Sequence, residues 1–319
     1  MAVAAPPAAG AHRKWPKRRP KVEQLMRLLR TFSETRRPLP GIASEEAREA
    51  LAMQMVASLR RLDYTNLVRA RHIDPRRADP SSPLFDPERA AMIHAEANRK
   101  DEAAWLVFLA THFGRHLVHG WRRVRDVYSG LGAGVWTWDR VSQDPVAFRS
   151  WLRANRHRIG GAFGNHRKYE SLDADSPSGT GAVVQSYVDW IGPTRSHDTR
   201  FAELVRAGGN DPHTIFDQFY RSMKVARFGR LGKFDFLALL GRLDIAPITP
   251  GSAYLSGATG PLGGARLLFG GDASAALSSE TLDAWLLELD EDLQVGMQVM
   301  EDSICNWQKS PTKFVHFRG

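Results

Sequence analysis

Apolar residues recur at helical spacing along most of this chain, and few segments alternate apolar and polar residues as a half-buried strand does. The strongest helical pattern covers residues 88–128. Its apolar side carries Trp105, Phe108, Leu109, His112, Phe113, Leu117, Trp121 and Val124. Its opposite side carries Arg115, Arg122, Arg123 and Arg125. This periodicity predicts an all-α protein.

Shorter stretches with the same periodicity predict further helices. They cover residues 22–33, 44–61, 146–155, 181–192, 199–207, 211–225 and 281–307, the last as one or two helices. Ser44 is expected to cap the helix that follows it, and Asp211 with Pro212 is expected to begin another. Residues 72–87 and 173–181 are rich in turn-forming residues and are expected to be loops.

The chain has 319 residues and a formal net charge of +9, which suits one large domain or two modest ones and predicts an anionic partner. Residues 1–21 include a proline-broken basic run and are expected to be a disordered arm, either bound to nucleic acid or simply solvated. Residues 22–87 are expected to form an N-terminal helical segment with a Pro-rich loop. Residues 88–319 are expected to form the main domain.

Cysteine usage and the apolar runs exclude several classes of protein. Cys305 is the sole cysteine, which excludes an internal disulfide and argues against a cysteine-ligated iron-sulfur cluster or structural zinc. A reducing, cytoplasmic setting is therefore expected. No apolar run reaches about 18 residues, so no membrane span is expected.

Residues 228–233 combine two glycines and two cations just before a predicted helix. Phe228-Gly229-Arg230-Leu231-Gly232-Lys233 is typical of a helix-hairpin-helix, in which glycines such as Gly232 let the backbone approach a DNA phosphate. Arg227, Arg230 and Lys233 are candidates for phosphate contacts that position DNA without reading its sequence. An ordinary connection between two helices is the alternative.

Residues 165–170 place several kinds of polar side chain after a glycine-rich stretch. Arg167 and Lys168 are candidates for phosphate contacts. Asn165 and His166 are candidates for hydrogen bonds to a base edge, and Tyr169 for stacking on a base. An exposed polar helix start is the alternative.

A base-excising enzyme needs a carboxylate near the sugar C1′ to stabilise positive charge or to orient a water. Asp244 is the first candidate because it falls where the helix after the hairpin should end. Asp235 is the second, although a carboxylate near a helix start is also expected to serve as a cap. Glu170 is the third.

Residues 258–266 contain enough glycine and proline for a tight loop with exposed amides, and a plain surface turn is the alternative. The residues expected to approach a ribose or phosphate there are Gly260, Gly263, Gly264 and Arg266. Aromatic side chains for a base pocket are Trp136, Trp138, Tyr169 and Tyr254.

Three histidines, His112, His116 and His119, recur at helical spacing in the strongest helical pattern. A row of this kind can bind a metal, but there is no His-Glu-x-x-His pattern and no evident carboxylate partner, so no metal site is expected. Cys305 is expected to pack rather than to act as a nucleophile. No cofactor is expected.

Four segments carry a family resemblance: WLVFLATHFG at residues 105–114, FGNHRKYESL at 163–172, GPLGGAR at 260–266 and CNWQK at 305–309. Together they resemble the α-glutamyl/putrescinyl thymine pyrophosphorylase family, and its third clade best, from about Glu88 to the C-terminus. The resemblance implies a helix-hairpin-helix protein similar to DNA glycosylases. Where such glycosylases carry an acid beyond the hairpin, this chain has Ile248-Thr249-Pro250. Asp244 is expected to take over, or the carboxylate comes from elsewhere.

The resemblance implies an enzyme that flips a hypermodified pyrimidine out of phage-type DNA and cleaves its N-glycosidic bond, leaving an abasic site. Glucosylated hydroxymethylcytosine and modified thymine are the expected substrates, double-stranded DNA is the expected partner, and defence against phage is the expected setting. One alternative is a non-catalytic helix-hairpin-helix module that binds modified DNA. Another is a helical structural protein whose basic arm is incidental.

Overall fold

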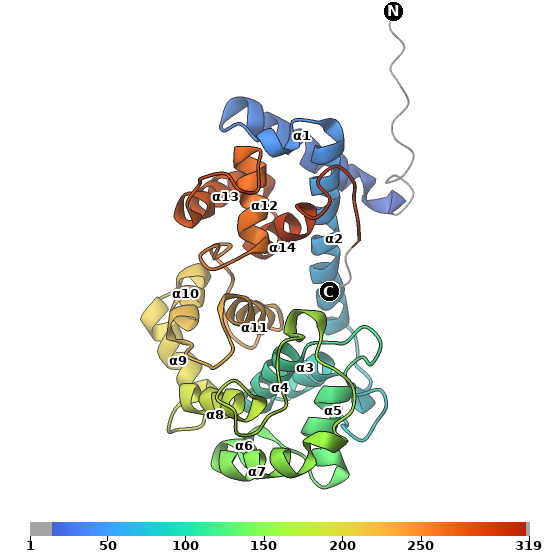
Figure 1. Ribbon diagram of the computed structural model, residues 1–319, viewed down its shortest axis with the longest axis vertical. Helices are drawn as coiled ribbons and strands as arrows, with labels where there is room; N and C mark the ends of the chain where they lie inside the picture. Colours follow the sequence, from blue (N-terminus) through green and yellow to red (C-terminus); the bar gives the residue numbers. More distant parts are fainter. Residues whose placement is uncertain (1–14, 317–319) are drawn as a thin grey trace, which may run out of the picture. The chain divides into compact units, whose positions relative to one another are not determined.

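The computed structural model describes residues 15–316, and in that range the chain forms fourteen α-helices and no β-strand (Figure 1). The all-α prediction is confirmed. The basic arm lies outside the described residues up to Lys14. Beyond that point the expected disorder is wrong, because Pro16–Arg18 is a 3-10 helix and α1 begins at Arg19. No helix within residues 15–316 is both long and apolar enough to cross a membrane.

The connections between the helices differ in length, and the longest cover residues 70–86, 156–179 and 243–259. Their bounds are α1 Arg19–Thr35, α2 Glu45–Arg69, α3 Pro87–Glu96, α4 Lys100–Phe113, α5 Arg122–Tyr128, α6 Trp138–Gln143, α7 Pro145–Asn155, α8 Thr180–Ile191, α9 His197–Gly208, α10 Pro212–Ser222, α11 Arg230–Arg242, α12 Gly260–Gly270, α13 Ser279–Leu293 and α14 Met297–Trp307. Further 3-10 turns are η2 Pro40–Ile42, η3 Pro75–Arg77, η4 Gly130–Gly132, η5 Arg156–Arg158 and η6 Asn165–Arg167.

Local capping chemistry fixes several of these starts. The Ser44 hydroxyl accepts a hydrogen bond from the Ala47 amide at 3.1 Å, and Asp211 accepts one from the Thr214 amide at 2.9 Å with Pro212 in the first turn. Each side chain satisfies an amide that has no partner within its helix. The predicted starts of α2 and α10 are therefore confirmed.

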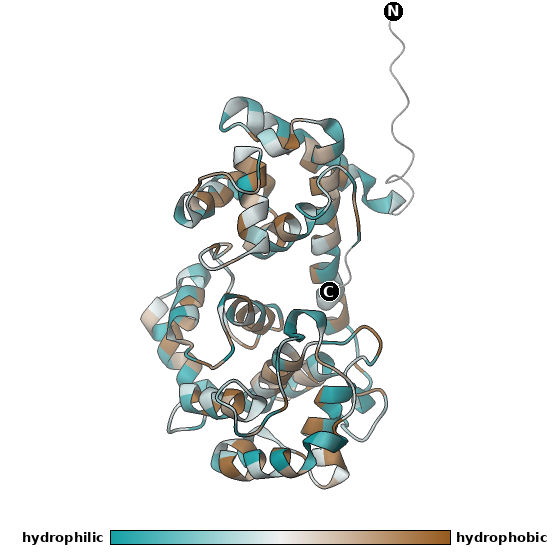
Figure 2. Cartoon of the chain, viewed as in Figure 1, coloured by the Kyte–Doolittle hydropathy of each residue, from teal (hydrophilic) through white to brown (hydrophobic). Residues whose placement is uncertain are grey.

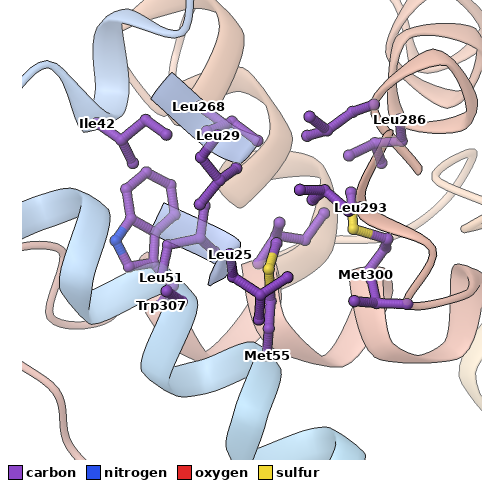
Figure 3. Close-up of a cluster of buried hydrophobic side chains, with 14 of the residues drawn as sticks. Leu25, Leu29, Ile42, Leu51, Met55, Leu268, Leu286, Leu293, Met300 and Trp307 are labelled. Carbon is purple, nitrogen blue, oxygen red and sulfur yellow. The ribbon is translucent and has the colours of Figure 1, made fainter. Parts of the chain in front are cut away.

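The chain divides into two compact units. The first joins the residues up to Asp63 with those from Ser252 onward, so the two ends of the chain build one core. Figure 3 shows this core, to which helices from both ends contribute. Its labelled side chains are Leu25, Leu29, Ile42, Leu51, Met55, Leu268, Leu286, Leu293, Met300 and Trp307.

The second unit comprises residues 64–251 and is built around α4. Figure 2 shows hydrophobic residues along α4 and mixed hydrophobic and hydrophilic turns on its neighbours. The rings of Phe108 and Tyr187 stack with centroids 3.7 Å apart, and both side chains are fully buried. The Tyr187 hydroxyl bonds to His197 at 2.7 Å, and His197 bonds in turn to Asp101 at 2.8 Å. A hydrogen-bonded polar chain therefore runs through this aromatic core.

These units do not follow the expected domain boundaries at residues 21 and 87, because the division falls after Asp63 and again after Gly251. The reason is long-range packing. Helices α1 and α2 bury their apolar faces against the C-terminal helices α12 to α14, and no local sequence signal records that pairing.

The expected helical row of three histidines is wrong. Helix α4 ends at Phe113 because Gly114 takes a φ of +65°, a conformation that favours glycine. His112 is therefore the one member of the row on the helix. It is fully buried and bonded to Thr180 at 3.0 Å, and burial holds the pKa of this imidazole well below its usual range.

Candidate nucleic-acid interface and pocket

Helices α10 and α11 are joined by residues 223–229, the predicted hairpin turn. Helix α11 starts at Arg230, and its N-cap residue, Gly229, has no side chain to cover the first amides. A β-carbon added at Gly229 would meet nothing within 4 Å, so the space beside this backbone is open. The positive end of a 13-residue helix therefore faces an accessible position, which suits an anion.

Four cations lie in the turn and the first turn of α11, and a fifth lies in the loop that Arg227 contacts; together they are called the basic surface. They are Lys168, Lys224, Arg227, Arg230 and Lys233. Lys233 is partly buried and donates to the Tyr220 carbonyl at 3.3 Å. Burial, and then the neighbouring charge of Lys224, lower the pKa of Lys233. Two of the three sequence candidates from the hairpin, Arg230 and Lys233, thus lie in the first turn of α11.

Arg167 does not lie on the surface, because only 6% of it is exposed. Its Nε donates to the Thr111 carbonyl at 3.0 Å, and its guanidinium lies 4.6 Å from the centre of the Phe228 ring. Burial lowers the pKa of this guanidinium, against the opposing influence of Asp235 and Glu170. Arg167 is therefore too buried for the phosphate contact expected from the sequence. Its guanidinium instead contacts Thr111 and Phe228 inside the second unit.

Gly232 is also buried, and its lack of a side chain makes room for Arg167. A β-carbon at Gly232 would lie 2.5 Å from Nη2 of Arg167. Direct contact between Gly232 and DNA, as the hairpin pattern predicts, is excluded in this conformation because the guanidinium covers that side of the helix.

Residues 165–170 form a loop that begins with η6, and four of its six residues are exposed. Asn165, His166 and Lys168 are exposed, and Tyr169 is 81% exposed, so these side chains are accessible to a ligand. The Lys168 ammonium lies 5.0 Å from the centre of the Tyr169 ring. The loop therefore offers a flat aromatic face beside a cation, an arrangement suited to an unpaired base.

Glu170, the third candidate acid, pairs with Arg227 at 3.1 Å, and its side chain is 7% exposed. Arg227 takes a φ of +61° and also donates to the Tyr169 carbonyl at 3.5 Å. The Glu170 carboxylate therefore links the 165–170 loop to the turn before α11.

Asp235 and Asp244 lie at different ends of α11. Asp235 lies in the second turn and is half-buried. Its negative charge opposes the lowering of the Arg167 pKa by burial. The expected capping role of Asp235 is wrong because Gly229 is the N-cap. Asp244 follows the helix and is separated from the basic surface by the length of α11, about 20 Å for 13 residues at 1.5 Å each.

Asp244 occupies the left-handed position that ends a helix, with a φ of +61°. The Ile245 amide donates to the Leu240 carbonyl at 3.0 Å, and the Asp244 amide to the Gly241 carbonyl at 3.0 Å. This is the pattern in which glycine is the usual residue. A carboxylate here costs conformational free energy that glycine would avoid, which makes the position a candidate for function.

A pocket of about 460 Å³ opens beside Asp244. Its lining residues are Asn66, Arg69, Ala70, Met92, Ala95, Glu96, Leu243 and Asp244. Arg69 pairs with the Asp244 carboxylate at 3.1 Å, and the Asp244 side chain remains 77% exposed. The volume falls within the range of small-molecule sites.

The polar pocket residues Asn66, Arg69 and Glu96 are not marked by any sequence pattern. The apolar periodicity of the second predicted helix fades after Arg61, yet α2 continues to Arg69. Asn66 and Arg69 therefore lie on two turns that the pattern did not extend to. Glu96 is the last residue of α3 and carries no motif.

The glycine-rich segment at residues 258–266 is not a loop, because Gly260–Gly270 is α12. A β-carbon at Gly264 would lie 2.3 Å from the Ile304 carbonyl oxygen, and one at Gly260 would lie 2.8 Å from Sγ of Cys305. These glycines therefore let α12 pack closely on α14. Arg266 donates from Nε to the Leu277 carbonyl at 3.2 Å.

The four aromatic residues expected in a base pocket do not lie together in the structure. Trp136 and Trp138 are buried in the core of the second unit, at 2% and 3% exposure. Tyr254 is half-buried and belongs to the first unit, as do the residues of α12. Tyr169 alone of the four is exposed near the basic surface.

The close packing of α12 on α14 leads to a prediction about the free energy of unfolding. Gly264→Ala is expected to lower the free energy of unfolding by about 1–3 kcal/mol, because the new methyl group meets a backbone carbonyl that has little room to move. Gly263→Ala, one residue earlier, meets nothing closer than 3.8 Å and is expected to raise it by about 0.5–1 kcal/mol through helix propensity. Urea denaturation of both variants measures the contrast. Equal effects would refute the packing role.

The model of the family described as alpha-glutamyl/putrescinyl thymine pyrophosphorylase clade 3 matches residues 46–319. No curated protein and no solved structure matches the chain. The matched range includes the basic surface and every residue that lines the pocket.

Proposed function

The chain belongs to the alpha-glutamyl/putrescinyl thymine pyrophosphorylase clade 3 family, and on this premise we propose that it excises a hypermodified pyrimidine from double-stranded DNA. The family name denotes enzymes that act on modified thymine. The finer proposal is N-glycosidic cleavage that leaves an abasic site, with modified thymine or glucosylated hydroxymethylcytosine as the base. Because such bases mark phage-type DNA, defence against phage is the proposed setting.

The basic surface is proposed to hold the DNA backbone. Open space beside Gly229 and the positive end of α11 suit a phosphate, and Arg230 and Lys233 lie in the same turn. With α10 before it and α11 after it, this turn is proposed to act as a helix-hairpin-helix. Binding of this kind is independent of sequence, so base selection must come from elsewhere on the protein.

The pocket beside Asp244 is proposed to receive the flipped nucleotide, and this pocket is the observation that carries the proposal. In glycosidic cleavage, positive charge develops on the sugar, and an exposed carboxylate at the pocket stabilises it or orients a water. Arg69 fixes one oxygen of Asp244 and leaves the carboxylate accessible. Asn66 and Glu96 offer polar groups to the base or sugar.

A second candidate reaction is favoured by the family name, which describes a pyrophosphorylase. In that reaction an amine, such as that of glutamate or putrescine, forms a C–N bond to the modified base as the C–O bond to a pyrophosphate group breaks, and the N-glycosidic bond remains intact. The two reactions leave different products, since one yields an abasic site and the other yields inorganic pyrophosphate. A binding module without catalysis yields neither.

The test is an incubation of the full chain with four DNAs, in the presence of an amine such as glutamate or putrescine: hypermodified-thymine phage DNA, glucosylated-hydroxymethylcytosine phage DNA, unmodified DNA and DNA that carries a pyrophosphate group on its modified thymine. Strand breaks after alkaline treatment count abasic sites, and an enzyme-coupled assay counts pyrophosphate. Abasic sites on a modified DNA alone are the expected result. Pyrophosphate without abasic sites would replace excision by displacement. Salt-sensitive binding with neither product would favour the non-catalytic module.

A further inference from the structure

The turn between His116 and Gly120 carries two exposed apolar side chains. Leu117 is 68% exposed and Val118 is 81% exposed, although the helical pattern places Leu117 in the core. The turn follows the end of α4 and precedes α5, and it is called the 116–120 turn below. Its exposure corrects the sequence expectation for Leu117.

The 116–120 turn is held by polar contacts that do not involve these two side chains. The backbones of His116 and Gly120 bond to each other in both directions, at 3.1 and 2.9 Å. Nδ1 of His116 accepts from the amides of Val118 and His119, each at 3.2 Å. The rings of His116 and His119 stack with centroids 4.8 Å apart. The turn therefore keeps its shape without burying Leu117 or Val118.

The 116–120 turn adjoins the loop of exposed Tyr169. The Gly164 amide donates to the Phe113 carbonyl at 2.7 Å, and a β-carbon at Gly164 would lie 2.8 Å from the carbonyl carbon of Gly114. The same loop is fastened to the start of α11 through the pair between Glu170 and Arg227. The turn, the loop and the basic surface are thus successive parts of one connected region.

Charge around the 116–120 turn points to an anionic partner. Arg115 precedes the turn and is exposed, and the Arg122 side chain after it is 57% exposed. Two exposed aliphatic side chains flanked in the chain by Arg115 and Arg122 suit a duplex, whose phosphates attract the cations and whose stacked interior accepts apolar groups.

We propose that Leu117 and Val118 form a wedge that enters the base stack of DNA held on the basic surface. The wedge fills space that a flipped nucleotide leaves and so favours the extrahelical state. This inference rests on the proposed function, because it requires a duplex bound at α11. It adds two positioning residues that no motif marks.

The test compares Leu117→Ala/Val118→Ala with the wild-type chain on a duplex that carries 2-aminopurine next to a modified thymine. The wild type is expected to raise 2-aminopurine fluorescence as the stack opens, and the double variant is expected to lose that rise. The affinity of the double variant for intact duplex is expected to fall about tenfold or more. For a duplex that already contains an abasic gap, the fall is expected to be markedly smaller, because there the stack is already open.

Two controls sharpen the test. Val146→Ala removes an aliphatic side chain that is 65% exposed on α7 and is expected to change neither readout. Leu117→Met/Val118→Ile keeps the apolar character and is expected to retain the fluorescence rise. If the double alanine variant binds and unstacks DNA like the wild type, the wedge is refuted and the proposed function still stands. The same result is expected if the 116–120 turn docks on another protein instead of DNA. A wild-type chain with no affinity for duplex would overturn the proposed function itself.

Discussion

Asp244→Asn is expected to reduce base release by about 100- to 1,000-fold, the usual loss when a group that stabilises transition-state charge is removed. Asn has nearly the same shape and tolerates the left-handed backbone at this position, which has a φ of +61°. The free energy of unfolding is therefore expected to stay within about 0.5 kcal/mol of the wild type. Single-turnover abasic-site formation, with urea denaturation in parallel, measures both quantities.

Asp244→Gly is the matched variant. Glycine is the favoured residue at this helix end, so stability is expected to be unchanged or up to about 1 kcal/mol higher. Base release is expected to fall as far as in Asp244→Asn. An inactive protein that is at least as stable as the wild type would identify Asp244 as a residue kept for function.

Asp235→Asn separates the two candidate acids. Asp235 acts on the buried Arg167, so its loss is expected to lower stability while leaving detectable base release. Full activity in Asp244→Asn together with abolished activity in Asp235→Asn would contradict the assignment and move the catalytic carboxylate to the second turn of α11.

Arg230→Glu/Lys233→Glu is expected to weaken binding to duplex DNA by about 100-fold at physiological salt, because two phosphate contacts become repulsive. Each lost contact is also expected to lower the slope of log affinity against log salt by about 0.9, so the double variant should lose about 1.8. Fluorescence anisotropy between low and moderate salt gives both numbers. Modified and unmodified duplexes should be affected alike, since backbone contacts carry no sequence information.

Arg27→Glu/Arg206→Glu is the matched control for charge. It makes the same change in net charge at exposed positions on α1 and α9, away from the start of α11 in the sequence. Its affinity is expected to fall only a few-fold, through the weaker overall field. Equal losses in both double variants would show that net charge, and not the helix start, binds the DNA.

Local features of this fold could be predicted from the sequence. Ser44 and Asp211 cap helices because their side chains reach amides two or three residues away, and that chemistry depends on neighbours in the chain. The helix break before Arg230 and the helix end near Asp244 follow from local composition as well. In the candidate site, such local signals mark Arg230, Lys233 and Tyr169. Tyr169 is exposed in the structure, and Arg230 and Lys233 are partly exposed.

The remaining features, namely the burial of Arg167, the packing of Gly264 and the position of the pocket, depend on contacts between residues distant in the sequence. Arg167 belongs to a polar motif, yet Phe228 and Thr111 bury it, and both are distant in the sequence. Gly264 signals a loop by composition, but it serves close packing against Ile304. The pocket combines the end of α2 with the residues after α11, so no single segment could reveal it.

Mass spectrometry of the small molecules released from hypermodified-thymine phage DNA tests whether the protein excises the modified base. The full chain is incubated with the DNA, the polymer is removed, and the filtrate is searched for the free modified base, with Asp244→Asn as the blank. The intact modified base is expected in the wild-type filtrate, in amounts equal to the abasic sites, and is expected to be lost in the variant. A filtrate that contains no free base, with every base still joined to its sugar, would contradict excision.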